Sequence, residues 1–310
     1  MATTVATWLL PHRIRRLAAW VVASLGVLAV VGYLAVCTIA ATMVTTPRRL
    51  AVPAPPAGAV SFAPVQFPAR GGDVQIAAWY LTRAGATQAI VLAHGKDSNR
   101  ATEFQGRFPA FAVALHNAGF VILMIDTRGH GASGDANFSF GLDERRDLLG
   151  GVDYLVAQGF APAKIGLLGV SMGAAAAIGA MHDEPALGAL VADCSYAEIE
   201  PLLQMHWATA SKLPDVFLPG TLAMGRFVLG KDLTTADPVF EIDDLAARPV
   251  LIIHGAADAF TPPDQGRALA AANPQASYWE VPGARHAGSY TAMPDEYVRR
   301  VVAFFGASLR

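Results

Sequence analysis

Short apolar runs alternate with longer segments of helical character along most of the chain. Few of these runs alternate polar and apolar residues, as a strand with one wet face does, so both faces of each strand are expected to be buried. That pattern is typical of an α/β protein with a parallel sheet covered by helices on both sides. The expected strands are residues 89–93, 120–125, 165–170, 187–192, 250–254 and 277–281, and the expected helices are residues 103–118, 143–158, 172–182 and 263–272.

Two regions depart from this alternation. Residues 62–67 and 74–80 are strand-like with only a Gly-Gly turn between them, which predicts an antiparallel start to the sheet. Residues 195–246 contain prolines and large apolar side chains without a strand pattern. We interpret this region as a helical insertion between two late strands, whose carboxyl ends border the binding crevice in open α/β sheets. The insertion is either a cap over a site or additional packing.

The N-terminal part of the chain carries the strongest apolar signal. Residues 17–44 contain no charged side chain, and this run exceeds the roughly 20 residues that cross a bilayer. A basic segment, residues 1–16, precedes it with Arg13, Arg15 and Arg16. The excess of positive charge on this side predicts a single-pass signal anchor with a cytoplasmic N-terminus and an extracytoplasmic domain. The alternatives are a cleaved signal peptide and a lipidated Cys37, because residues 34–37 resemble a lipoprotein cleavage box.

Residues 45–59 are rich in proline and alanine, which predicts a semi-rigid, extended linker. The globular domain is expected to occupy residues 60–310.

Composition narrows the possible functions. Hydrophobic residues make up 53% of the chain and charged residues 15%, which excludes a disordered protein. The net charge of −2 offers no basic surface for nucleic acid. Cys37 and Cys194 are too few for a disulfide framework or the usual four-ligand zinc site. The chain also lacks the H-E-x-x-H and P-loop sequences, so we expect no metal and no cofactor.

One motif carries chemistry. Gly169-Val170-Ser171-Met172-Gly173 is a G-x-S-x-G sequence that follows an expected strand and precedes an expected helix. A sharp turn there would expose the Ser171 hydroxyl near the helix N-terminus, where amides and the helix dipole stabilise negative charge. Ser171 is therefore the candidate nucleophile.

With this motif the chain resembles the α/β-hydrolase superfamily over roughly residues 60–310. His94-Gly95 follows the strand expected at 89–93, where that family builds half of its oxyanion hole. The resemblance implies that the backbone N–H groups of Lys96 and Met172 are the two oxyanion donors. The sequence beginning at Asp126 is similar to the family's D-x-R-G-x-G-x-S loop, which is structural in most members. Asp126, Arg128 and His130 are accordingly assigned no chemical step.

A serine nucleophile needs a base, and the base needs an orienting acid. The family order is serine, acid, histidine. His286 lies in a loop after the last expected strand and is the candidate base, while His254 is expected to be a packed histidine. Asp258 fits the family's acid position, with Asp193 as the rival because some relatives use that position.

These residues predict a serine hydrolase that cleaves carboxylic esters or thioesters through an acyl-enzyme. The large apolar side chains of the insertion, with the anchor, favour a small acyl or lipid-derived substrate; equally, these side chains only pack the cap. The alternatives are a serine peptidase or amidase of the same fold, a lipid transferase that shares the acyl-enzyme, and a non-catalytic, membrane-tethered binding protein.

Overall fold

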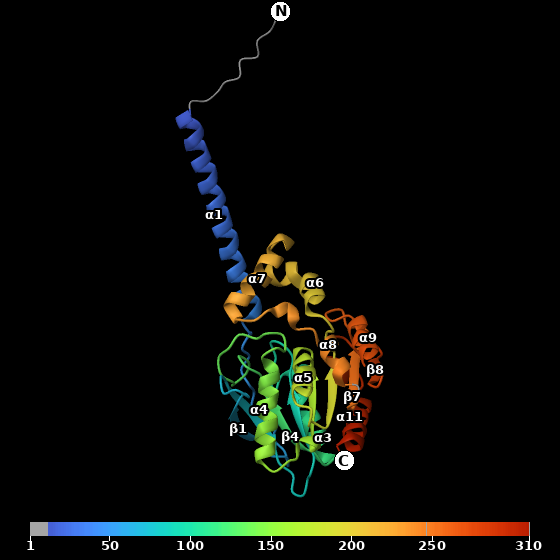
Figure 1. The fold of residues 1–310 in the computed structure, drawn as a ribbon. Coiled ribbons are helices and arrows are strands. Elements are labelled where there is room, and N and C mark those ends of the chain that lie inside the picture. The colour runs from blue at the N-terminus through green and yellow to red at the C-terminus, as the bar shows by residue number, and fades with distance from the viewer. Residues whose placement is uncertain (1–11, 246, 310) are drawn as a thin grey trace, which may run out of the picture.

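The computed structural model describes residues 12–245 and 247–309, and its centre is an eight-stranded sheet in the order β1-β2-β4-β3-β5-β6-β7-β8 (Figure 1). β2 pairs antiparallel with both β1 and β4, and all other neighbours pair parallel. The predicted mostly parallel sheet with an antiparallel start is confirmed. The strands are β1 (Ala63–Pro68), β2 (Gln75–Leu81), β3 (Ala89–Ala93), β4 (Val121–Ile125), β5 (Ile165–Val170), β6 (Ala189–Asp193), β7 (Val250–Gly255) and β8 (Ser277–Val281).

Helices cover both faces of the sheet, which explains the continuous apolar runs of the central strands. Every residue of β3, β4, β5, β6 and β7 is buried. One apolar core lies under α4, α5, α8 and α9, and a second lies under α3 and α11 on the opposite face. These helices are α3 (Phe108–Asn117), α4 (Glu144–Ala157), α5 (Met172–Asp183), α8 (Pro238–Ile242), α9 (Pro263–Ala272) and α11 (Pro294–Ser308); the single turns η1 (Pro162–Lys164) and α10 (Ser289–Ala292) lie between them in sequence.

The helix predicted at residues 103–118 is broken in two. α2 (Glu103–Gly106) is a single turn in which Phe104 and Gln105 have φ angles of 53° and 58°, and α3 starts afresh at Phe108. These left-handed conformations cannot continue a right-handed helix. The sequence did carry a signal for this break that the predicted helix ignored, because Gly106 and Pro109 lie within it and Pro109 stands in the first turn of α3.

The helix α1 (His12–Thr45) extends away from the body of the molecule (Figure 1). Its 34 residues correspond to about 51 Å at 1.5 Å per residue, and among the described residues it is the one helix long and apolar enough to cross a membrane. Its buried residues all lie in the C-terminal third and are mostly small: Cys37, Ala40, Ala41 and Thr45. Residues 1–11, most of the predicted basic segment, lie outside the described residues.

The segment after α1 is attached to the domain rather than acting as a free spacer. Residues 46–62, all of them described, form neither helix nor strand. The Arg49 guanidinium donates to the backbone oxygens of Gly131 and Ser133 and pairs with Asp135. The Arg48 N–H donates to Asp97. The base of α1 is thereby fixed on the domain surface, a contact that composition alone does not reveal.

The insertion between β6 and β7 divides into two parts. Its first part is helical and lies between α1 and the carboxyl ends of the strands (Figure 1). It consists of α6 (Ile199–Ser211), η2 (Asp215–Phe217), α7 (Leu218–Leu229) and η3 (Leu233–Thr235). The second part, α8 with η4 (Asp243–Leu245), buries Ile242 and Leu245 in the main core. We use the word cap for residues 199–235 only.

Candidate active site

Ser171 occupies a sharp turn between β5 and α5. Its φ and ψ angles are 54° and −119°, a conformation that L-residues rarely adopt. The turn requires both flanking glycines. A Cβ atom on Gly169 would collide with the carbonyl of Gly173, and a Cβ on Gly173 would collide with the carbonyl of His94. The G-x-S-x-G sequence therefore folds in the strand-turn-helix context that was predicted for it.

The structure brings His286 and Asp258 to this serine. His286 Nε2 lies 2.9 Å from Ser171 Oγ, and His286 Nδ1 lies 2.8 Å from Asp258 Oδ2. The other oxygen of Asp258 accepts the N–H groups of Phe260 and Thr261 at 2.9 and 2.8 Å, which fixes the carboxylate plane. Since an ionised carboxylate can only accept, Nδ1 carries the proton and Nε2 accepts from the serine hydroxyl.

The rival acid, Asp193, is engaged elsewhere. Its two oxygens accept from the Ser289 hydroxyl at 2.9 Å and from the Tyr297 hydroxyl at 3.0 Å. Burial raises the pKa of this carboxyl to about 7. His254 is fully buried and donates to the Thr261 carbonyl at 2.8 Å, as expected of a packed histidine. Asp193 thus ties α10 and α11 to the end of β6, and His254 ties the loop that carries Asp258 and Thr261 to β7.

Two backbone N–H groups are available beside the serine hydroxyl. A Cβ on Gly95 would lie 3.1 Å from Ser171 Cβ, so the His94-Gly95-Lys96 loop packs directly against the serine. The Gly95 N–H is already bonded to the buried Glu103 carboxylate at 2.7 Å. Within residues 12–245 and 247–309, neither Lys96 N–H nor Met172 N–H has a backbone acceptor. The two N–H groups predicted as oxyanion donors thus have no backbone acceptor, and Lys96 and Met172 line the same pocket as Ser171.

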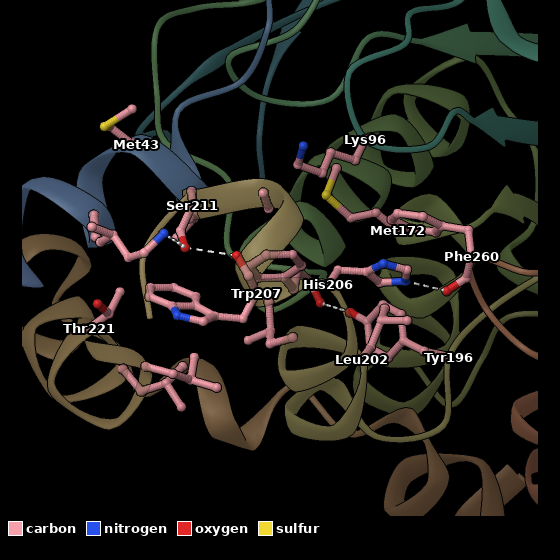
Figure 2. A pocket seen from close by; sticks show the side chains of 18 of the residues that line it. Met43, Lys96, Met172, Tyr196, Leu202, His206, Trp207, Ser211, Thr221 and Phe260 are labelled. Carbon is pink, nitrogen blue, oxygen red and sulfur yellow. Dashed lines mark hydrogen bonds between the residues drawn. The ribbon is translucent and has the colours of Figure 1, made fainter. Parts of the chain in front are cut away.

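Ser171 is one of the residues that line an apolar pocket with a volume of about 460 Å³. Figure 2 shows other side chains of this lining. Its walls come from the cap, from α1 and from the part of the domain around Ser171. Sequence reasoning did not place α1 at the site. His206 of the cap was also missed: it stacks on Phe260 at 4.3 Å between ring centroids, and Phe260 in turn lies 4.8 Å from His286. No sequence signal identifies such a contact, because it joins segments distant in the chain.

Comparison with known proteins assigns the chain to a family. The sequence profile of the prolyl oligopeptidase family matches residues 107–310, well over half of the chain. The chain belongs to the prolyl oligopeptidase family. It is therefore a hydrolase with the α/β-hydrolase fold, as the resemblance predicted.

Relatives of this prolyl oligopeptidase family member are bacterial proteins without a described activity. It is 28% identical to the uncharacterized protein MT2364 of Mycobacterium tuberculosis over 79% of this chain and 82% of that protein. It is also 28% identical to the uncharacterized protein YqkD of Bacillus subtilis, over 69% of this chain and 70% of that protein.

Solved structures show the same fold at low identity. The Pyrococcus furiosus esterase Pf2001 superposes with a TM-score of 0.69 at 21% identity, over 86% of this chain and 100% of the esterase. A Mycobacterium tuberculosis puromycin-hydrolyzing peptidase superposes with a TM-score of 0.61 at 18% identity, over 80% of this chain and 40% of the peptidase. Both an esterase and a peptidase thus share the fold of this family member.

The remaining polar groups near the site have structural roles in this family member. His94 accepts the Thr127 N–H at 3.0 Å, and His130 accepts the Asp97 N–H at 3.2 Å. Burial lowers the pKa of each imidazole to about 4, so both are neutral. Arg128 forms a buried, multiply bonded ion pair with Asp147, and Asp126 pairs with the buried Arg100.

Cys194 could add a metal ligand to the site, as the third member of a cluster within the described part of the chain. Its sulfur lies within 4.8 Å of ligand atoms of Asp258 and His286. Burial raises the pKa of this thiol well above its usual value, whereas metal binding needs the thiolate. The other two groups are already hydrogen-bonded to each other, so the cluster fits a proton-transfer site better than a metal site.

Proposed function

We propose that this protein is a serine hydrolase that cleaves carboxylic esters or thioesters, with Ser171 as nucleophile, His286 as base and Asp258 as the orienting acid. The observation that supports it is the continuous hydrogen-bonded chain from Asp258 through His286 to Ser171 at the inner end of an apolar pocket. A non-catalytic binding protein would have no need to keep three such groups within hydrogen-bonding distance of one another.

In this mechanism the Ser171 oxygen attacks the acyl carbonyl while His286 Nε2 takes the hydroxyl proton. The carbonyl oxygen becomes an oxyanion, which the N–H groups of Lys96 and Met172 stabilise together with the N-terminal end of α5. His286 then gives its proton to the leaving alcohol or thiol. Water attacks the acyl-enzyme with His286 again as base, which releases the acid and restores Ser171.

The pocket favours an ester or thioester over a peptide. Of the 21 lining residues, all within the described part of the chain, none is Asp or Glu, and Lys96 carries the one permanent charge. A peptidase that holds a substrate amine needs a carboxylate at that point. The peptidase alternative is supported by the family to which the chain belongs and by the puromycin-hydrolyzing neighbour, so it is the second arm of the test.

The test combines active-site labelling with turnover in detergent micelles. A fluorophosphonate probe should label the wild type and the exposed-site control Ser277→Ala, but not Ser171→Ala. The wild type should hydrolyse p-nitrophenyl esters and acyl thioesters faster than aminoacyl p-nitroanilides. Labelling that survives in Ser171→Ala would show that Ser171 is not the nucleophile. Faster cleavage of the anilides than of the esters would establish peptidase activity instead. No labelling and no turnover in any series would favour the binding protein.

We also propose that α1 anchors the protein with its N-terminus in the cytoplasm and the hydrolase domain outside. The arginines at the start of α1 support this orientation. Cys37 is fully buried with its sulfur 3.7 Å from the Phe217 carbonyl of η2, which leaves no space for a lipid on the thiol. Carbonate-washed membranes should retain the full-length chain, and protease should reach the domain in spheroplasts without lysis. A shortened or lipidated mature form would contradict the anchor, and protection of the domain until lysis would reverse the orientation.

A further inference from the structure

We propose that the C-terminal part of α1 is a wall of the substrate pocket, and that the pocket takes the acyl chain of a membrane lipid ester that enters sideways from the bilayer. This inference rests on the proposed hydrolase function and names its substrate class. It assigns to the membrane helix a role in substrate selection in addition to anchoring.

The first support is that α1 is packed into the cap. The Tyr33 hydroxyl donates to the Val216 carbonyl at 2.8 Å, and its ring stacks on Phe217 with centroids 5.2 Å apart. Ala40 is buried in one apolar cluster with Trp207 of α6 and Leu218 of α7. Helix α1 and the cap therefore form one structural unit above Ser171.

The second support is the lining of the pocket. Five residues of α1 face it, and they occupy successive turns of one helical side: Val36, Ile39, Ala40, Met43 and Val44. Ile39 and Met43 are 60% and 68% exposed although they line the pocket. The pocket is thus open along this side of α1, and the opening is bordered by apolar side chains.

The pocket is also elongated, and its two ends are lined by different parts of the protein. Figure 2 shows Lys96, Met172 and His206 toward one end, and Met43 and Thr221 toward the other. The catalytic groups therefore lie at one end and the membrane helix at the opposite end. This arrangement suits an ester whose carbonyl is at Ser171 and whose chain points toward α1.

The length of the apolar run places the opening at the membrane surface. Residues 17–44 are 28 uncharged residues, about eight more than the roughly 20 that a bilayer core requires. The surplus, residues 37–44, contains most of the α1 residues that line the pocket, and Tyr33 and Val36 lie within about one turn before it. Large apolar side chains on the cap are also exposed to the surroundings, with Val216 at 65% and Phe227 at 82%. An acyl chain can then pass from lipid into the pocket without crossing water, which avoids the cost of exposing its methylene groups.

The test uses the full-length protein in phosphatidylcholine vesicles and p-nitrophenyl esters with chains of two to sixteen carbons. For the wild type, kcat/KM should rise at least tenfold from acetate to the long esters. Ile39→Trp fills the pocket from α1, so the ratio of kcat/KM for the long esters to kcat/KM for acetate should fall tenfold or more. The matched control is Leu28→Trp, on the exposed part of α1, which should leave the whole series unchanged.

The outcomes separate the two proposals. A flat chain-length profile, or an Ile39→Trp variant that loses acetate and long esters equally, overturns the pocket inference while Ser171-dependent acetate hydrolysis keeps the proposed function. If the wild type hydrolyses no ester, the proposed function fails. Lipid binding in the pocket is then tested separately, by photocrosslinking Ser171→Ala with a phospholipid that carries a diazirine at the end of its acyl chain. Crosslinks to the α6 residues that line the pocket, lost in Ile39→Trp, would support lipid entry; their absence would overturn it.

Discussion

Tyr33 of α1 donates a hydrogen bond from its hydroxyl to the backbone oxygen of Val216, in the cap. The bond is possible because the neighbouring positions on α1 carry small side chains: Cys37, Ala40 and Ala41. Small side chains let α1 approach α7 closely. α1 and α7 are consequently in extensive contact along this side.

α1 and α7 approach each other closely at Gly220. A Cβ there would lie 2.5 Å from both Cys37 Sγ and the Tyr33 hydroxyl oxygen. We expect Gly220→Ala to push α7 away from α1, with a loss of about 1–3 kcal/mol in the free energy of unfolding and faster proteolysis within the cap. Thermal unfolding and limited proteolysis in detergent measure both effects.

The same helix offers a matched control for that variant. A Cβ on Gly225 would meet Leu233 at 3.5 Å, an ordinary contact. Gly225→Ala should therefore be neutral or stabilising by up to about 1 kcal/mol, since alanine has the higher helix propensity. Equal midpoints for the two alanine variants would show that α1 and α7 are not packed as described.

The two candidate acids should differ in catalysis. Asp258→Asn removes the acceptor that holds the His286 proton on Nδ1, and loss of this role costs about 10⁴-fold in kcat in a well-studied serine protease. Asp193→Asn leaves His286 untouched and should retain activity within about tenfold. Ester hydrolysis by the two variants at pH 8 measures the difference. The reverse ranking would transfer the acid role to Asp193.

Asp193 should instead influence stability through its ionisation. Burial raises the pKa of its carboxyl to about 7, against about 3.9 in an unfolded chain. Between these values the folded protein holds a proton that the unfolded chain has released, so this carboxyl stabilises less and less as pH rises from about 4 to about 7. Asp193→Asn cannot ionise, and its thermal midpoint minus that of the wild type should increase over this window and then level off. A constant difference across pH would contradict the shifted pKa.

The conformation of Ser171 predicts a conflict between activity and stability. A non-glycine residue at φ 54° and ψ −119° costs about 1–3 kcal/mol. Ser171→Gly relieves this cost, whereas Ser171→Ala keeps it and loses the same hydroxyl. Both variants should be inactive, but the glycine variant should unfold at the higher temperature. Equal midpoints would show that the turn is not strained.

The sheet and the strand ends could be predicted because each depends on local sequence. Apolar runs buried on both faces identified the central strands, and the G-x-S-x-G sequence has one compact turn that it can form. The order serine, acid, histidine then directed attention to Asp258 and His286, which the structure brings within hydrogen-bonding distance of each other and of Ser171.

The pocket could not be predicted, because its walls come from segments remote in sequence. The hydropathy of α1 indicates a membrane span, but the apolar side chains of α1 can be buried equally well in lipid or against the cap. Likewise, the proline-rich composition after α1 gives no sign that Arg49 is held by the loop at Gly131 and Ser133. The stack of His206 on Phe260 joins the cap to the loop of Asp258, and no spacing rule connects these residues.

The attachment of residues 46–62 to the domain surface has a consequence for how the protein would encounter its substrate. A protein anchored by α1, as we propose, would hold Ser171 at a constant height above the bilayer, because Arg48 and Arg49 are bonded to the domain and Tyr33 is bonded to the cap. It cannot extend to collect substrate from solution as a protein on a flexible tether can. Its encounters become two-dimensional, so its rate should follow the mole fraction of substrate in the membrane and fall when inert lipid dilutes that substrate at constant bulk concentration.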